Sequence, residues 1–206
     1  IYPGQGSQYI GMLNDLSIQF DIVRDVFEKF DHFLDKILPK PLSKYIYPPP
    51  SFSSQETKKL ENELTQTNIA QASMGAADVA MHKLLIKLGV KPDMVGGHSY
   101  GEYVALHTAG VFSEEVLALV SEARGRFILE SAKPEPGTMA AVKAGEDEVK
   151  KEIEKIDNVW IANLNSPFQT VITGMNSSVQ EAIERLKDKG LIAIPIHVAC
   201  AFHSPI

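Results

Sequence analysis

The spacing of hydrophobic positions along the chain changes at about residue 138. Before it, apolar residues recur every three or four positions, as in amphipathic helices, in segments that end at proline or glycine. After it, short apolar runs typical of strands alternate with two charged amphipathic segments. The pattern therefore predicts helices in the first part, and a second part in which strands and helices alternate.

In the first part, the spacing predicts helices over residues 12–38, 68–88, 100–109 and 114–132. Asp78 is the only charged residue in the first half of the helix at 68–88, so we expect that helix to be largely buried. A short strand ending at Met94 and Val95 should precede the helix at 100–109.

The second part carries a recognisable order of elements. Four apolar runs are predicted as strands, at residues 139–142, 159–164, 170–173 and 192–198. Two charged segments are predicted as helices, at residues 146–156 and 177–189. The order strand, helix, strand, strand, helix, strand is typical of a ferredoxin-like fold. We therefore predict an α/β protein with part of a large α/β core in 1–137, a ferredoxin-like (βαββαβ) small subdomain in 138–198, and a return to the core in 199–206.

The segment Gly97-His98-Ser99-Tyr100-Gly101 lies where the predicted strand turns into a helix. It has the G-x-S-x-G pattern of a nucleophile elbow, in which two glycines allow a sharp turn and the serine hydroxyl projects beside the helix N-terminus. Backbone N–H groups and the positive end of the helix dipole then face any oxyanion formed there. A loop of small residues is the alternative, but the flanking strand and helix favour acyl transfer through an ester of Ser99.

Composition limits the function classes without selecting one. With 206 residues and 44% apolar content, the chain can bury a sizeable core. Its net charge of −6 argues against a nucleic-acid-binding protein, although a local basic patch could still bind an acidic partner. A single cysteine, Cys200, excludes an intrachain disulfide framework, and no apolar run reaches the ~18 residues of a membrane span. We predict a cytoplasmic protein that binds neither nucleic acid nor membrane.

Three segments identify a family when taken together: Pro3-Gly4-Gln5-Gly6-Ser7-Gln8, Gly97-His98-Ser99-Tyr100-Gly101-Glu102 and Ala201-Phe202-His203-Ser204-Pro205. The chain resembles the malonyl-CoA:acyl-carrier-protein transacylases and the acyltransferase domains of polyketide and polyunsaturated fatty acid synthases. The segments 67–71, 123–126 and 165–167 extend the resemblance along the whole chain. It implies an α/β-hydrolase-like large subdomain into which the ferredoxin-like small subdomain is inserted.

The resemblance also assigns catalytic roles. Serine is a weak nucleophile that needs an adjacent base, most often histidine. Among six histidines, His203 corresponds to the family's base. His98 is next to Ser99 in sequence, so its side chain should point away from Ser99, and we expect it to support the turn. The resemblance implies that the backbone N–H groups of Gln5 and Tyr100 form the oxyanion hole.

The resemblance implies a malonyl substrate as well. Arg124 matches the family's arginine that binds the free carboxylate of a malonyl group. A guanidinium suits this role because it offers two parallel hydrogen-bond donors. Gln71 and Asn165 match further substrate-binding positions, and Phe202 would restrict room for an α-methyl branch. Cys200 and Tyr100 depart from the family's usual residues, a histidine and a smaller aliphatic side chain.

No cofactor is implied, because coenzyme A arrives as the thioester substrate and the phosphopantetheine belongs to the acyl carrier protein. A nucleotide-loop interpretation of Gly4-Gln5-Gly6 fails on glycine spacing, and no metal-ligand spacing is visible. We expect the chain to be truncated at both ends. The backbone carbonyl that orients His203 should then lie beyond residue 206, and further domains of a megasynthase are possible partners.

The sequence therefore predicts a malonyl transferase acting from coenzyme A to an acyl carrier protein. Two alternatives remain open. A serine esterase or thioesterase would share the elbow but has no use for Arg124, and a non-catalytic docking domain of the same family would form no acyl-enzyme.

Overall fold

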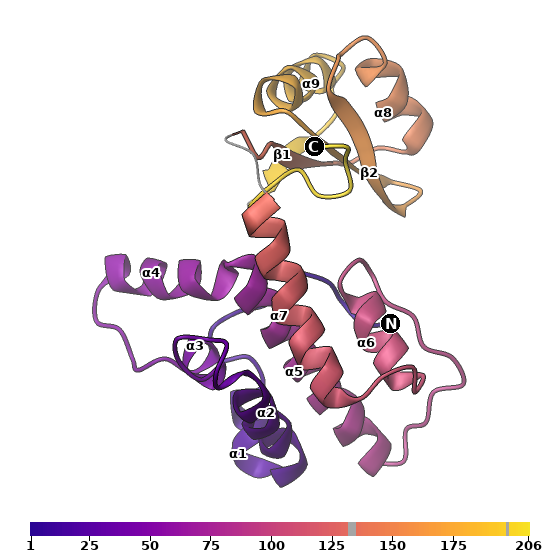
Figure 1. Cartoon of the computed structure of the whole chain (residues 1–206). Helices are drawn as coiled ribbons and strands as arrows, with labels where there is room; N and C mark the ends of the chain where they lie inside the picture. The colour runs from indigo at the N-terminus through magenta and orange to yellow at the C-terminus, as the bar shows by residue number, and fades with distance from the viewer. Residues whose placement is uncertain (132–134, 197) are drawn as a thin grey trace. The chain divides into compact units, whose positions relative to one another are not determined.

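The computed structural model describes residues 1–131, 135–196 and 198–206, and internal contacts divide the chain into two compact units (Figure 1). Unit 1 is Ile1–Glu130 and unit 2 is Ser131–Ile206. This division precedes the predicted boundary at residue 138 and groups residues 199–206 with unit 2. One reason is local, since the N–H of Ala201 donates to the carbonyl of Pro136 at 2.7 Å.

Unit 1 is mainly helical. Its helices are α1 (Asn14–Gln19), α2 (Asp21–Leu34), α3 (Ser43–Ile46), α4 (Ser54–Thr65), α5 (Thr67–Lys87), α6 (Gly101–Thr108) and α7 (Glu114–Ser131). The predictions for α5, α6 and α7 are confirmed to within two residues, except that residue 132 lies outside the described residues.

The single helix predicted over residues 12–38 is wrong. Phe20 has an extended backbone, with φ −125° and ψ 110°, and it separates α1 from α2. Its N–H closes α1 by donating to the carbonyl of Leu16, and its side chain packs against the core of unit 1. Tertiary packing of this ring therefore overrides a helical hydrophobic pattern that continues through it.

Helix α5 lies in the core of unit 1, as predicted from a first half in which Asp78 is the only charged residue. Its buried residues include Ile69, Met74 and Val79 together with a series of alanines, Ala70, Ala72, Ala76, Ala77 and Ala80. Short side chains let neighbouring helices approach, and α2 packs on it with Val23, Val26, Phe27, Phe30 and Leu34 buried. Burying each large apolar side chain contributes roughly 1.5–3 kcal/mol to folding.

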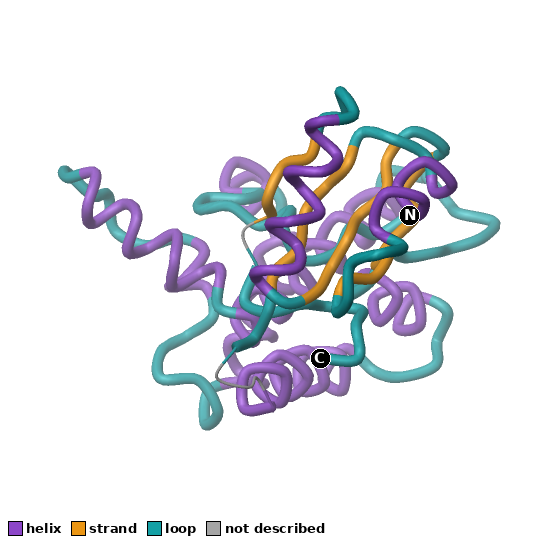
Figure 2. The backbone as a smooth tube through the Cα atoms, turned by 90° about the horizontal axis from the view of Figure 1, so that it is seen from above, coloured by secondary structure: helices purple, strands orange, loops and turns teal. Residues whose placement is uncertain are grey.

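Unit 2 contains a four-stranded antiparallel sheet whose strands run side by side in Figure 2. Its elements in chain order are β1 (Thr138–Val142), α8 (Glu146–Ile153), β2 (Val159–Ser166), β3 (Gln169–Gly174), α9 (Asn176–Asp188) and β4 (Ala193–Ile196). The sheet order is β2-β3-β1-β4, and each neighbouring pair is antiparallel. The predicted order of elements is thus observed, although β4 ends at Ile196 and residue 197 lies outside the described residues.

The core of unit 2 lies between one face of the sheet and its two helices. Ala140, Val142 and Ile172 come from the strands, and they pack with Val149 of α8 and Leu186 of α9. No helix in the described ranges combines the length and the apolar character needed to cross a membrane.

Candidate functional site

The Gly97–Gly101 segment forms a tight turn that leads into α6, whose first residue is Gly101. Ser99 has φ 51°, in the left-handed region that non-glycine residues occupy rarely and at an energetic cost. The N–H groups of Gly101 and Glu102 donate to the carbonyls of His98 and Ser99 at 3.0 and 3.2 Å, closing the turn. This strained serine between a sharp turn and a helix N-terminus is the geometry of a nucleophile elbow.

The predicted strand before the turn is wrong in its extent. Met94 and Val95 have no strand assignment, and the chain instead forms an isolated parallel bridge between Tyr2 and Gly97. The N–H of Tyr2 donates to the carbonyl of Gly96 at 2.8 Å, and the N–H of His98 donates to the carbonyl of Tyr2 at 3.0 Å. The elbow is therefore anchored to the N-terminal segment by two backbone hydrogen bonds.

Both motif glycines are required by close backbone contacts. A Cβ on Gly97 would lie 2.0 Å from the carbonyl carbon of Gly101. A Cβ on Gly101 would lie 2.2 Å from the carbonyl oxygen of Tyr2 and 2.7 Å from that of Pro3. Backbone atoms cannot rotate out of the way as a flexible side chain can.

We expect Gly101→Ala to lower the free energy of unfolding by about 1–3 kcal/mol or more, because the added methyl group overpacks against backbone. Gly96→Ala is the matched control, since a Cβ there meets no atom within 4 Å in the described part of the chain. Urea unfolding of both variants measures the difference. Equal stabilities would show that the elbow adapts to a side chain at Gly101.

The loop that carries Gln5 touches the elbow. A Cβ on Gly4 would lie 2.6 Å from the carbonyl oxygen of His98 and 3.4 Å from Cβ of Ser99. Nε2 of Gln71, a fully buried residue of α5, donates to Oε1 of Gln5 at 3.2 Å. The structure thus brings Gln5 and Gln71 together, and the adjacent Gly4 lies against the elbow.

Three groups in this region are available for hydrogen bonds to a bound molecule, two backbone N–H groups and one side-chain oxygen. The backbone N–H groups of Gln5 and Tyr100 donate to no other backbone group there. Oε1 of Gln71 is buried and accepts no hydrogen bond from those residues. Because buried polar groups are normally paired, these atoms are suited to a bound molecule.

The side chain of Tyr100 lies between α6 and α7. It is fully buried, and its hydroxyl lies 2.6 Å from Oγ of Ser121 on α7. Ser121 uses its only hydroxyl proton to donate to the carbonyl of Leu117 at 2.5 Å, so Tyr100 is the donor of the first bond. Burial raises the pKa of the Tyr100 hydroxyl, which keeps this donor proton in place.

Arg124 lies on α7, half-buried, with its guanidinium carbon 5.5 Å from the ring centroid of Tyr103. No carboxylate among the described residues forms an ion pair with it. The other arginines do form such pairs: Arg24 with Asp21, Arg126 with Glu122 and Glu130, and Arg185 with Glu181. Arg126 is thus occupied by ion pairs, whereas Arg124 keeps its carboxylate-binding donors for another partner.

Residues predicted to act with Ser99 also occur in unit 2. His203 has φ 57° and an exposed side chain, and Phe202 before it is half-buried. Their loop is held by the Ala201 bond to Pro136 and by Oγ of Ser204, which donates to the Ala201 carbonyl at 2.6 Å. The local backbone therefore presents His203 at the surface of unit 2.

Asn165 is exposed near the end of β2, and its Nδ2 donates to Oε1 of Gln169 at 3.0 Å. Unit 1 contains Ser99, Gln5, Tyr100, Gln71 and Arg124. His203, Phe202 and Asn165 belong to unit 2.

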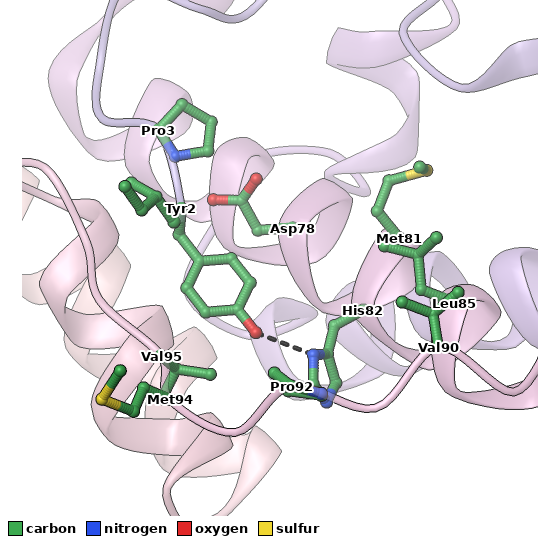
Figure 3. A pocket seen from close by; sticks show the side chains of 11 residues that line it. Tyr2, Pro3, Asp78, Met81, His82, Leu85, Val90, Pro92, Met94 and Val95 are labelled. Atoms are coloured by element: carbon green, nitrogen blue, oxygen red, sulfur yellow. Dashed lines mark hydrogen bonds between the residues drawn. The ribbon is translucent and has the colours of Figure 1, made fainter.

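A separate pocket of about 350 Å³ opens in unit 1 beside the Tyr2 segment (Figure 3). The Tyr2 hydroxyl lies 2.7 Å from Nδ1 of His82 and 3.0 Å from Oγ1 of Thr108. Burial raises the pKa of Asp78 to about 7 and lowers that of His82. The lining is mostly apolar and consists of Ile1, Tyr2, Pro3, Asp78, Met81, His82, Leu85, Val90, Pro92, Met94 and Val95, none of them a predicted site residue.

Across residues 1–131, 135–196 and 198–206, no three His, Cys, Asp or Glu side chains are grouped so that they could hold a metal ion.

Comparison with known proteins adds family information. The model of the acyl transferase domain family matches residues 1–206. Mycoketide-CoA synthase of Mycobacterium tuberculosis is 37% identical over 206 residues, which cover 100% of this chain and 5% of that protein. The malonyl CoA-acyl carrier protein transacylase of Bacillus subtilis is 34% identical over 212 residues, covering 100% of this chain and 62% of that protein.

A solved structure has the same fold. It is a malonyl-transacylase in complex with its type II polyketide synthase acyl-carrier protein, with a TM-score of 0.84 and 31% sequence identity. The match covers 97% of this chain and 62% of that chain. The chain thus spans less than two thirds of the length of these relatives.

Proposed function

Because this chain belongs to the acyl transferase domain family, we propose that it transfers a malonyl group from coenzyme A to the phosphopantetheine thiol of an acyl carrier protein. The name of the Bacillus subtilis relative supports this donor and acceptor, and the solved transacylase complex supports the carrier protein as partner. The reaction belongs to fatty acid or polyketide biosynthesis, requires no cofactor, and is expected in the cytoplasm.

The observation that carries this proposal is the elbow around Ser99. Its left-handed backbone, the two glycines in backbone contact and the adjoining helix N-terminus support a serine nucleophile. The contact of Gly4 with Ser99 supports Gln5 as the second contributor to the oxyanion hole. Two backbone donors beside a nucleophile are suited to a tetrahedral oxyanion.

In the first half-reaction, Oγ of Ser99 attacks the thioester carbonyl while His203 takes the hydroxyl proton. The carbonyl electrons move onto oxygen, and the N–H groups of Gln5 and Tyr100 stabilise that negative charge. Collapse of the intermediate breaks the C–S bond, and His203 returns its proton to the departing coenzyme A thiolate. The product is a malonyl ester of Ser99.

The second half-reaction reverses these roles. His203 takes the proton of the phosphopantetheine thiol as its sulfur attacks the ester carbonyl, and the same N–H groups stabilise the oxyanion. The C–O bond to Ser99 then breaks, and His203 gives the proton back to Oγ.

Arg124 is the basis for a malonyl rather than an acetyl substrate. Its guanidinium has no protein carboxylate partner among the described residues, and a planar fork of donors matches a carboxylate. Gln71 offers an unused buried oxygen beside Gln5. Phe202 and Asn165 remain proposed as substrate-binding residues.

We expect Arg124→Ala to lower kcat/KM for malonyl-CoA by roughly 10- to 100-fold, because hydrogen bonds to a charged group contribute about 1.5–3 kcal/mol. Transfer from acetyl-CoA should change little, since acetyl has no carboxylate. The measurement is the ratio of kcat/KM values for the two donors, which cancels differences in the amount of folded enzyme.

Arg126→Ala is the control for this experiment. Arg126 lies two residues further along α7 and already pairs with Glu122 and Glu130, so its loss should leave the donor ratio unchanged. Equal loss of activity toward both donors in Arg124→Ala would assign Arg124 a structural role and remove the argument for a malonyl group.

The architecture proposed for this reaction is an α/β-hydrolase-like large subdomain with a ferredoxin-like small subdomain inserted in it. The sheet order of unit 2 supports the second part. The hydrogen bond from Ala201 to Pro136 supports the insertion, because it ties together the segments that enter and leave the sheet.

A further inference from the structure

Helices α6 and α7 meet through two matched pairs of side chains in unit 1. Ser121 and Arg124 are three residues apart on α7, and Tyr100 and Tyr103 are three residues apart at the start of α6. Residues at this spacing share one face of a helix. Tyr100 contacts Ser121, and Tyr103 contacts Arg124, so the two faces are joined at successive turns.

The two tyrosine rings also contact each other. Their centroids are 6.1 Å apart and their planes differ by 14°, a stacked arrangement. The guanidinium of Arg124 follows as the next group, 5.5 Å from the Tyr103 ring centroid, within the range of a cation–π interaction. Tyr100, Tyr103 and Arg124 therefore form a stack that begins at the residue after the nucleophile.

The ring of Tyr100, the first member of the stack, is fixed in position. The Tyr100 side chain is 1% exposed, and its hydroxyl donates to Ser121. Gly75 of α5 makes room for that hydroxyl, since a Cβ there would lie 2.3 Å from it. A ring held at both its hydroxyl and its face cannot shift without breaking a buried hydrogen bond, which is costly in a core.

We propose that Tyr103 is a positioning residue for acyl selectivity: its ring holds the guanidinium of Arg124, against the fixed ring of Tyr100, in the orientation that receives the acyl carboxylate. This inference rests on the proposed role of Arg124. An unsupported arginine has many rotamers, and ordering it on binding opposes affinity, so a guanidinium already held over a ring binds its carboxylate at lower entropic cost.

We expect Tyr103→Leu to lower the ratio of kcat/KM for malonyl-CoA over acetyl-CoA by about 3- to 30-fold, the range that corresponds to losing one cation–π interaction. Tyr103→Phe keeps the ring face and should retain the ratio. In the Arg124→Ala background, Tyr103→Leu should produce no further change in the ratio, because the group that the ring positions is absent.

A phenylalanine ring with increasing numbers of fluorine atoms at position 103 separates charge from shape. Fluorine weakens the negative face of the ring while preserving the packing, so the donor ratio should fall stepwise with fluorination. A constant ratio across the fluorinated series, or an unchanged ratio in Tyr103→Leu, overturns the inference while leaving the role of Arg124 intact. If Arg124→Ala leaves the ratio of kcat/KM values for malonyl-CoA and acetyl-CoA unchanged, that result overturns both this inference and the proposed role of Arg124.

Discussion

Incubation of the protein with malonyl-CoA is expected to attach one malonyl group, on Ser99, and Ser99→Ala is expected to abolish the attachment. The hydroxyl is the only atom of that side chain able to form the ester, and the elbow holds it in a strained backbone position that no neighbouring residue shares. Intact-protein mass spectrometry followed by peptide mapping measures the adduct and its position.

Ser7→Ala is the matched control, because Ser7 is an exposed serine in the loop that follows Gln5. This variant should acquire the adduct normally. An adduct that persists in Ser99→Ala, or that maps to another residue, contradicts the proposed nucleophile.

The same experiment distinguishes the alternative functions. Addition of a carrier protein that bears phosphopantetheine should move the malonyl group to the carrier thiol. Loss of the group to water at the same rate without a thiol would support an esterase or thioesterase. A folded protein that never forms the adduct would support a non-catalytic docking domain.

The second large effect is expected at His203. His203→Ala should slow acylation of Ser99 by about 10²- to 10⁴-fold, the contribution of a positioned general base. Binding of acyl-CoA should be nearly unchanged, because the oxyanion donors and Arg124 remain. Stopped-flow or rapid-quench measurement of the acylation rate, with binding measured on the Ser99→Ala background, separates the two effects.

His98→Ala is the informative comparison for His203→Ala. His98 is next to the nucleophile in sequence, and its carbonyl closes the turn through Gly101. We expect its side chain to be dispensable for proton transfer. Near-normal acylation in His203→Ala together with a large loss in His98→Ala would reassign the base to His98.

Most helices and strands could be predicted because their hydrophobic spacing is local. The first half of α5, in which Asp78 is the only charged residue, predicted a buried helix, and the charged segments of unit 2 predicted α8 and α9 between strands. The errors lie where distant contacts decide the backbone. Phe20 breaks a helical pattern by packing its ring on the core, and Met94 and Val95 form no strand in a segment tied to Tyr2 by an isolated bridge.

The site residues also differ in whether local sequence or distant contacts reveal them. The elbow could be read from five adjacent residues, because a serine between two glycines before a helix specifies its own geometry. Arg124 could be identified only by resemblance, since its sequence neighbourhood does not distinguish it from Arg126. The ion pairs of Arg126 and their absence from Arg124 in the described residues separate the two.

By itself, therefore, the sequence determined the turn at Ser99, the helical and strand periods, and the order of elements in unit 2, all of which depend on residues close together in the chain. Only the tertiary structure decided that Gln71 holds Gln5, that Gly75 admits the Tyr100 hydroxyl, and that Tyr103 lies under Arg124. Those contacts join residues far apart in sequence, and side-chain packing between helices selects them from many partners that the hydrophobic pattern allows equally.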